Sequence, residues 1–219
     1  MEALHAITPA VTIRSTSVSS LDNNVYLLTA SQTGHQLLID AADDPAAIGR
    51  LIASAVGDGP SPRLSLIVTT HSHPDHIRAL AWLVQATGAA VLSGRADSAA
   101  IERQTGVRVE RGLDHGDLVG VPGLQLRVIA LRGHTPGSVA LAYQADGEPV
   151  HLFTGDSLFP GGVGNTDRDP DRFGQLMADV VARVFEVYPD DAIVHPGHGD
   201  PTTLGAERPY LDEWRQRGW

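Results

Sequence analysis

The chain has 219 residues, 42% of them hydrophobic and 19% charged, which is the composition of a globular protein able to bury a substantial core. The formal net charge of −10, with 16 scattered arginines and no lysine, argues against nucleic acid as a partner, because phosphate binding requires clustered basic side chains. The absence of cysteine excludes disulfides, thiolate metal ligands and a cysteine nucleophile.

The first residues, MEALHAITPAV, lack the basic start and apolar run of a signal peptide. No stretch reaches the roughly 18 apolar residues that a membrane span needs. We therefore expect a cytoplasmic protein that acts on a small molecule and has no membrane partner. The sequence leaves the oligomeric state open.

The first half of the chain alternates β-type runs with helical patterns, as an α/β layer does. The turn residues SQTG join two runs into a hairpin, and Pro45 begins a helix whose apolar residues, such as Ile48 and Leu51, share one face. In chain order we predict strands over residues 11–14, 25–30 and 35–40, a helix over 45–56, a strand over 64–70, a helix over 77–87, a strand over 90–93 and a short helix over 98–104.

The second half repeats this organisation in a coarse way. We predict strands over residues 124–131, 139–143 and 149–154, a helix over 170–187, a strand over 192–195 and a last helix over 210–217. Two β-rich halves, each closed by helices, predict a sandwich of two sheets with helices outside. Because no linker separates the halves, we predict one domain over residues 1–219.

The segment THSHPDH, residues 70–76, lies where a buried strand ends and a helix begins. Alternate residues of extended backbone share a side, so His71 and His73 are predicted to converge on one cation. Asp75 and His76 follow a proline that bends the chain, and they are predicted to face a second position. The spacing differs from that of a His-Glu-x-x-His protease, in which the two histidines lie one helical turn apart.

Three further segments place a histidine or an aspartate directly after an apolar strand. They are GHTPGS with His134, FTGD with Asp156, and HPGHG with His195 and His198. A rigid sheet can direct such loop side chains towards one point. Imidazole and carboxylate groups without soft sulfur suit Zn²⁺, Fe²⁺ or Mn²⁺.

Together, HSHPDH, GHTPGS, TGDSLF and PGHG resemble the ligand motifs of the metallo-β-lactamase superfamily in order and separation. The resemblance covers residues 71–199 and implies an α+β fold, a four-layered αββα sandwich with the metals at the edge between the two sheets. It also implies a ligand set for two metal ions, normally zinc. The first ion would be held by His71, His73 and His134, the second by Asp75, His76 and His198, and Asp156 would bridge the two.

Two such ions about 3.5–4 Å apart can share a water and lower its pKa from about 15.7 towards 7, which provides a hydroxide nucleophile without Ser or Cys. One ion polarises the scissile carbonyl and the other can stabilise the leaving group. Asp75 is the predicted catalytic residue, because its carboxylate can also orient the bridging hydroxide. We therefore predict a binuclear metal-dependent hydrolase.

Departures from the superfamily's patterns narrow the range of reactions that we expect. Metallo-β-lactamases proper usually carry Cys or Ser in place of Asp156, and acyl-homoserine lactonases typically carry Tyr in place of Phe159. The stretch LFPGGVGNTD resembles glyoxalase II, which favours cleavage of a hydroxyacyl thioester. Asn165 replaces the Lys or Arg that usually binds the glutathione carboxylate, and the sequence stops soon after PGHG, before the helical domain that completes the glutathione site. We therefore expect another thiol carrier or another ester.

Other interpretations stay open beside this one. A persulfide dioxygenase-like oxidoreductase resembles the same motifs but uses one iron, held by the equivalents of His71, His134 and Asp156. Metal content and oxygen consumption distinguish it from a hydrolase. A lactonase is a further alternative. A non-catalytic metal-binding domain is disfavoured, because all seven ligand positions are filled.

The remaining histidines are predicted to be structural or at the surface, because no ligand lies near them in sequence. They are His5, His35, His115 and His151. His195 lies three residues before His198, so a role in supporting the site or lining its pocket stays open. Arg78 either reaches the rim of the pocket and attracts an anionic substrate or projects into solvent.

Overall fold

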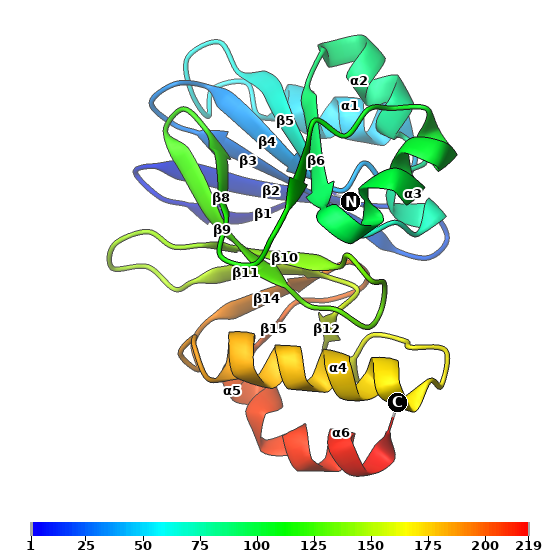
Figure 1. Cartoon of the computed structure of the whole chain (residues 1–219). Coiled ribbons are helices and arrows are strands. Elements are labelled where there is room, and N and C mark those ends of the chain that lie inside the picture. Colours follow the sequence, from blue (N-terminus) through cyan, green and yellow to red (C-terminus); the bar gives the residue numbers. More distant parts are fainter. Residues whose placement is uncertain (1, 219) are drawn as a thin grey trace.

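The computed structural model describes residues 2–218 as two β-sheets packed face to face with helices on both outer sides (Figure 1). In Figure 1 the sheet from the amino-terminal part and its helices form the upper half, and most of the second sheet with the carboxy-terminal helices forms the lower half. The layers follow the order helix, sheet, sheet, helix. The predicted αββα sandwich is therefore confirmed, whereas the assignment of residues 1–219 to one domain stays a prediction.

The first sheet has seven strands in the order of the chain. They are β1 (Glu2–Ile7), β2 (Val11–Val18), β3 (Asn23–Ala30), β4 (His35–Ile39), β5 (Arg63–Thr69), β6 (Ala90–Gly94) and β7 (Arg111–Leu113). The pairs up to β3–β4 are antiparallel and the later pairs are parallel. The parallel part needs crossover helices. These helices are α1 (Pro45–Ser54), α2 (Leu80–Thr87) and α3 (Arg95–Thr105).

The second sheet has six strands in the order β15-β14-β11-β10-β9-β8. They are β8 (Leu118–Val121), β9 (Leu124–Ala130), β10 (Val139–Tyr143), β11 (His151–Gly155), β14 (Ile193–Pro196) and β15 (Thr202–Thr203). A small hairpin, β12 (Leu158–Phe159) with β13 (Gly162–Val163), follows β11. The outer helices are α4 (Pro170–Val180), α5 (Leu204–Glu207) and α6 (Leu211–Arg217).

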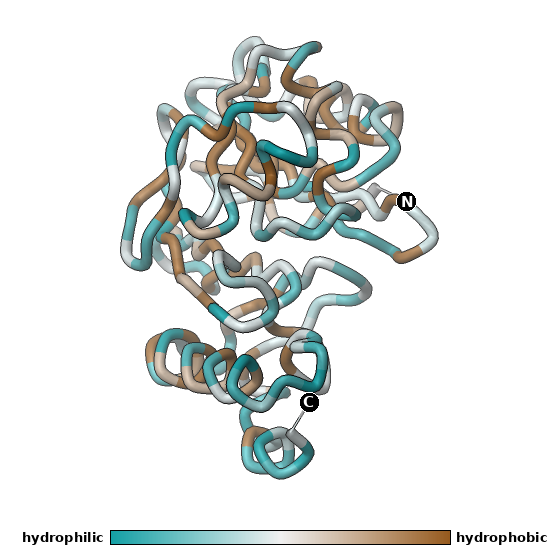
Figure 2. The backbone as a smooth tube through the Cα atoms, turned by 45° about the vertical axis from the view of Figure 1, so that its right-hand side comes forward, coloured by the Kyte–Doolittle hydropathy of each residue, from teal (hydrophilic) through white to brown (hydrophobic). Residues whose placement is uncertain are grey.

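Alternation along the strands divides the apolar side chains among three cores. On β3, Leu27 packs towards the helices of the first sheet, whereas its neighbour Leu28 packs between the two sheets. On β11, Leu152 faces α4 and Phe153 faces the other sheet. This follows from the period of two in a strand, which sends successive side chains to opposite faces. In Figure 2, hydrophilic colour marks many of the loops at the periphery, whereas hydrophobic colour recurs along the segments in the interior of the upper half.

Helices α1 and α4 begin at the residues that the sequence predicted. The side chain of Asp44 accepts a hydrogen bond from the Ala47 amide at the start of α1, and Asp169 caps α4 in the same way. A proline occupies the first turn of each helix, where no backbone N–H is needed. The predicted helix over 170–187 changes to a π-helical segment at Val181–Phe185, which widens the turn while Phe185 packs against Trp214.

Four strands end at the same edge of the sandwich and carry the predicted site. The histidine-rich segment follows β5, His134 follows β9, Asp156 follows β11, and His198 follows β14. Strands β11 and β14 are parallel neighbours, and Gly155 pairs with Pro196, so the loops after them start side by side. Within residues 2–218, no helix combines the length and the apolar character needed to cross a membrane.

Candidate metal centre

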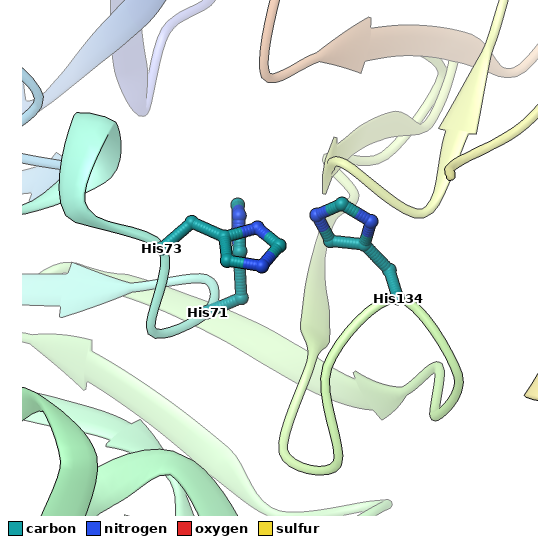
Figure 3. Close-up of side chains that lie close together, drawn as sticks. All are labelled: His71, His73 and His134. Atoms are coloured by element: carbon teal, nitrogen blue, oxygen red, sulfur yellow. The ribbon is translucent and has the colours of Figure 1, made fainter. Parts of the chain in front are cut away.

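His71, His73 and His134 form the first group of potential metal ligands (Figure 3). One ring nitrogen from each of the three lies within 4.8 Å of the others. The Nε2 atoms of His71 and His134 are buried and have no hydrogen-bond partner among the described residues. A buried polar atom without a partner is costly, and a cation at this point would satisfy both nitrogens.

Asp75, His76 and His198 form the second group. The Nε2 atoms of His76 and His198 are 3.1 Å apart, and the Oδ2 atom of Asp75 lies 3.6 Å from the first and 3.4 Å from the second. The 3₁₀ turn at Pro74–His76 turns His76 inward, where it is fully buried. The bend at the proline therefore separates the second group from the first, as the sequence predicts.

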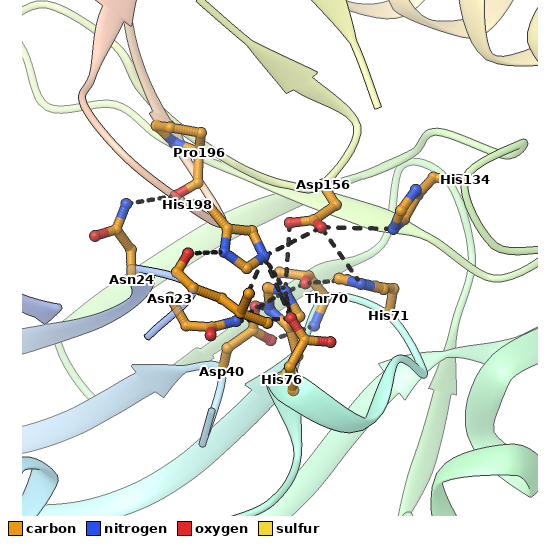
Figure 4. A network of polar contacts seen from close by, with 12 residues as sticks. Asn23, Asn24, Asp40, Thr70, His71, His76, His134, Asp156, Pro196 and His198 are labelled. Carbon is orange, nitrogen blue, oxygen red and sulfur yellow. Dashed lines mark hydrogen bonds and ion pairs between the residues drawn. The ribbon is translucent and has the colours of Figure 1, made fainter. Parts of the chain in front are cut away.

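Asp156 lies between the two groups (Figure 4). Its Oδ2 atom is 4.0 Å from Nε2 of His71 and 3.6 Å from Nε2 of His134. On the other side, its carboxylate oxygens lie 3.3 Å from Nε2 of His76 and 3.3 Å from Nε2 of His198. One carboxylate that faces both groups can contact two cations at once, so all seven predicted side chains belong to one cluster.

The carboxylates and the burial of the cluster shift the pKa values of its histidines in opposite directions. Burial opposes the charged form of His76, but Asp40 and Asp156 outweigh this effect and raise its pKa to about 10. Burial also opposes the charged form of Asp156, yet the contacts with His198 and His76 hold its pKa far below the usual range. Burial, followed by the charge of His76, lowers the pKa of His71 well below its ordinary value. A neutral His71 beside ionised carboxylates is the state in which these groups bind a metal.

Asp40, which the sequence analysis did not single out, fixes His76 and the strand end beside it. Its carboxylate accepts hydrogen bonds from the Thr70 amide (2.7 Å), the Thr70 hydroxyl (2.8 Å) and Nδ1 of His76 (2.9 Å). The hydrogen bond at Nδ1 leaves Nε2 of His76 directed into the cluster. The position of Asp40 in the sequence could have indicated this role, because it directly follows the apolar strand β4 just as Asp156 follows β11.

Backbone carbonyls orient two other histidines in the same manner. Nδ1 of His134 donates to the carbonyl of Asn165, and Nδ1 of His198 donates to the carbonyl of Leu21, both at 2.7 Å. Each bond fixes the ring and leaves Nε2 free for a cation. Leu21 lies in the turn between β2 and β3, so a segment remote in sequence completes the site.

Asp97, also missed, joins two of the ligand loops. It is buried at the start of α3 and accepts hydrogen bonds from the Ser72 amide (2.9 Å), the Gly137 amide (2.8 Å) and the Thr135 hydroxyl (2.5 Å). Ser72 lies between His71 and His73, and Thr135 follows His134. One carboxylate therefore holds the two loops of the first group in register.

Asn23 is the third residue that the sequence analysis missed. Its fully buried side chain donates to Oδ2 of Asp75 at 2.9 Å and lies 3.4 Å from Nε2 of His198. The backbone of Asn23 also forms an isolated β-bridge with His198. Nothing in the local sequence indicates this role, because it depends on the approach of the β2–β3 hairpin to the loop after β14.

Two glycines let the backbone approach Asp156 closely. A Cβ atom on Gly197 would lie 2.1 Å from Oδ1 of Asp156, and one on Gly164 would lie 1.7 Å from the carbonyl oxygen of Asp156. A side chain at either position is incompatible with this packing. The glycines of the PGHG and GGVG segments are therefore required by the close approach of the two loops to Asp156.

The structure also locates the residues whose roles the sequence left open. His195 is buried between the sheets and hydrogen-bonds to Nδ1 of His151, apart from the metal-ligand groups. Arg78 pairs with Asp43 at 3.0 Å. Asn165 contributes its backbone carbonyl to His134, while the ring of Phe159 lies 6.4 Å from that of His198.

The fold and the site together define an αββα protein with a histidine–aspartate metal centre. Residues 20–198 match the model of the metallo-beta-lactamase superfamily. The chain therefore belongs to this superfamily.

Among curated proteins, the chain is 37% identical over 180 residues to a hydroxyacylglutathione hydrolase of Anaeromyxobacter dehalogenans, a match that covers 81% of this chain and 61% of that protein. The chain thus spans about three fifths of that relative's length.

Two solved structures resemble the fold over most of its length. The crystal structure of ETHE1 from Myxococcus xanthus matches with a TM-score of 0.76 and 26% identity, covering 93% of this chain and 84% of that one. The structure of TTHA1623 in a di-iron-bound form matches with a TM-score of 0.67 and 32% identity, covering 89% of this chain and 96% of that one. The second protein thus binds two metal ions within a similar fold.

Proposed function

We propose that this chain is a binuclear metal-dependent hydrolase that cleaves a thioester or an ester. The observation that carries the proposal is the position of Asp156, whose carboxylate faces ring nitrogens of both histidine groups at 3.3–4.0 Å. Its buried Oδ1 atom has no hydrogen-bond partner among residues 2–218. Buried donor atoms that converge without partners fit a pair of cations, and the absence of sulfur suits zinc, iron or manganese.

The two groups divide the ligands of the proposed centre. His71, His73 and His134 would hold one ion, Asp75, His76 and His198 the other, and Asp156 both. Bound ions of this kind lower the pKa of a shared water towards about 7 and polarise a scissile carbonyl. Asp40, Asp97 and the carbonyls of Leu21 and Asn165 keep the rings in place, so little reorganisation is needed when the ions bind.

Asp75 is the proposed catalytic residue of the cluster. Burial opposes ionisation, but the Asn23 amide and His76 outweigh it and lower the pKa of the Asp75 carboxyl group, which is therefore ionised at neutral pH. The side-chain amide of Asn23 donates a hydrogen bond to Oδ2 of this carboxylate. The carboxylate can accept a proton from the attacking water and hold it in line with the substrate carbonyl.

The similarity to hydroxyacylglutathione hydrolases supports thioester cleavage over the other reactions of the superfamily. Asp156 in place of Cys or Ser and Phe159 without a hydroxyl group weaken the lactamase and lactonase alternatives. Because Asn165 carries no charge where glyoxalase II usually has Lys or Arg, we propose a thiol carrier other than glutathione, or a simple ester, as the leaving group.

One observation favours a second candidate, a mononuclear iron oxidoreductase of the persulfide dioxygenase type. The buried atoms without partners include Nε2 of His71, Nε2 of His134 and Oδ1 of Asp156, which are donors from the three residues that such an enzyme would use. The hydrolase remains the first proposal, because His73, His76 and His198 add donors that a single ion does not need.

Metal analysis combined with a substrate panel tests both candidates. We expect two metal ions per chain by elemental analysis, and hydrolysis of acyl thioesters or esters in preference to lactones and phosphodiesters. A protein that binds one iron, consumes oxygen with a persulfide and leaves every ester intact would replace the hydrolase by the second candidate.

A further inference from the structure

A cavity of about 770 Å³ lies between the loop that precedes α4 and the end of α6, and Asn165 of its lining also hydrogen-bonds to His134. Its lining includes Val163, Asn165, Arg168 and Gly218. This volume lies within the range of about 300–1,000 Å³ that is typical of pockets for small molecules.

Among the described residues of this lining, Arg168 is the charged one. Within the described part of the chain its guanidinium group makes no ion pair or hydrogen bond, and the side chain is exposed. Two other arginines near this lining have partners. Arg172 pairs with Asp167 at 2.6 Å, and Arg217 donates a hydrogen bond to the carbonyl of Gly161 at 2.8 Å. An uncompensated cation in a chain of net charge −10 is available for an anionic ligand.

The backbone at this point adopts a conformation that ordinary side chains avoid. Asp167 and Arg168 follow one another in the left-handed region, with φ of 57° and 58°. The Asp167 amide donates to the side chain of Asn165 at 2.9 Å, and Arg172 holds the Asp167 carboxylate, so the surrounding contacts enforce the turn. Strain that neighbouring groups maintain at a cavity wall is typical of a functional position.

The same loop is attached to the metal centre. The carbonyl of Asn165 accepts the hydrogen bond from His134, and Arg172 donates to the carbonyls of Gly133 (2.8 Å) and His134 (2.5 Å). Arg168 follows Asn165 by three residues, so their Cα atoms are at most about 10 Å apart. Because Asn165 both contacts His134 and lines the cavity, a substrate that reacts at the centre would extend towards Arg168.

We propose that Arg168 is a specificity-determining residue that binds a carboxylate on the substrate. The inference rests on the hydrolase proposed above and names its substrate class: a thioester or ester with an alkyl segment, for which Val163 provides an apolar wall, and a terminal carboxylate. A guanidinium group binds a carboxylate through two parallel hydrogen bonds. A substrate with a carboxamide in place of the carboxylate has the same shape but lacks the negative charge that the guanidinium group attracts.

Pairs of acetyl thioesters test this subsite. One member of each pair is the S-acetyl derivative of an ω-mercapto acid, and the other is the S-acetyl derivative of the isosteric carboxamide. A series of alkyl lengths covers the distance to Arg168. At the best length we expect kcat/KM of the metal-loaded enzyme to be about tenfold higher for the carboxylate. Arg168→Gln should abolish the preference, Arg168→Lys should retain part of it, and added salt should reduce it. Arg50→Gln, which removes an exposed arginine of α1 on the opposite side of the sandwich, should change nothing.

A binding measurement separates the subsite from the reaction. S-methyl ethers of the same acids lack a scissile carbonyl, and calorimetry should show about tenfold weaker binding to Arg168→Gln than to the unchanged protein. If thioesters are hydrolysed with equal kcat/KM for acid and amide at every length, the subsite is refuted while the hydrolase stands. If no ester is cleaved, the proposed function fails, and equal binding of the ethers by both proteins would refute the subsite as well.

Discussion

Two groups of histidines occupy opposite chemical environments in this molecule. The metal centre contains His71, His73, His76, His134 and His198, which face the carboxylates of Asp75 and Asp156. The second group, which we call the inter-sheet histidines, consists of His5, His151 and His195. These three lie among Tyr26, Phe153 and Ser15.

The inter-sheet histidines pack as aromatic rings. His195 stacks on Phe153 at 4.9 Å and on His151 at 5.2 Å, and Nε2 of His195 lies 2.9 Å from Nδ1 of His151. Burial is the main cause that lowers the pKa of all three, well below the ordinary value in the case of His195. No carboxylate contributes to these shifts, so the three rings are neutral at pH 7.

Neither the burial of histidines nor their number is enough to identify a metal site. His76 and His195 are both almost fully buried, yet the pKa of His76 is raised to about 10 and that of His195 is strongly lowered. The difference between these two residues comes from Asp40 and Asp156, which lie beside His76, whereas no carboxylate of the described residues lies beside His195. The carboxylates around His76 therefore favour a cation there, and burial among aromatic rings leaves His195 neutral.

Removal of the shared carboxylate should give the largest effect. Asp156→Ala should lower hydrolytic activity by about 10³-fold or more, which corresponds to about 4 kcal/mol of transition-state stabilisation, and should reduce the metal content below two ions per chain. Activity assays measure the loss of hydrolysis, and elemental analysis measures the metal content. The control is Asp114→Ala, which removes an exposed aspartate that pairs with Arg95. Full activity with unchanged metal content would contradict the bridging role.

Loss of the carboxylate that joins the ligand loops should give a smaller effect. Asp97→Asn keeps the shape but retains one acceptor oxygen for three donors, so the loops of His71 and His134 are held less firmly. We expect metal affinity to fall by about 10–100-fold, and the free energy of unfolding by about 1–3 kcal/mol. Competition with a chelating dye and urea titration measure the two. Asp114→Asn serves as the matched surface control, and an unchanged affinity would refute the role of Asp97.

Acid should destabilise the protein through the inter-sheet histidines. Their folded-state pKa values lie below the unfolded value of about 6.5, so the unfolded chain binds more protons and stability rises with pH. Their contribution is complete above about pH 6.5, and it decreases as the pH falls towards the folded-state pKa by up to about 1.4 kcal/mol per pH unit for each group.

Urea unfolding of the chelator-treated protein between pH 7 and pH 5 measures this slope. His195→Phe, which keeps the aromatic stack on Phe153 but cannot titrate, should have a shallower slope than the unchanged protein. Chelation removes the competing effect of metal release. Identical slopes for the two proteins would show that His195 does not take up a proton on unfolding.

The smallest effect is expected at His115, which belongs to neither group. Its side chain is exposed in the turn before β8, and its neighbours Asp114 and Asp117 pair with Arg95 and Arg111. His115→Ala should change the free energy of unfolding by no more than about 0.5 kcal/mol and leave metal content and activity unchanged. A large loss of activity would show that a site beyond the metal centre had been overlooked.

Most of the fold was accessible from sequence because strong local patterns mark it. The strands β3, β5, β9 and β10 and the helices α1, α2 and α4 agree with the predicted ranges to within a few residues. The missed strands lie at sheet edges or are very short, such as β1, β8 and β15. Edge strands bury only part of their surface, so their composition carries a weaker periodic signal.

The sequence by itself identified the seven side chains of the cluster, because each lies in a short motif after an apolar strand and the motifs together resemble those of the metallo-β-lactamase superfamily. Only the tertiary structure decided how these groups are supported. Asp40, Asp97 and Asn23 act on residues 25 to 175 positions away in the chain. The position of Arg168 at a cavity was likewise invisible in its local sequence. Such contacts depend on how hairpins and loops pack against one another, and a pattern read along one segment contains no information about a distant partner.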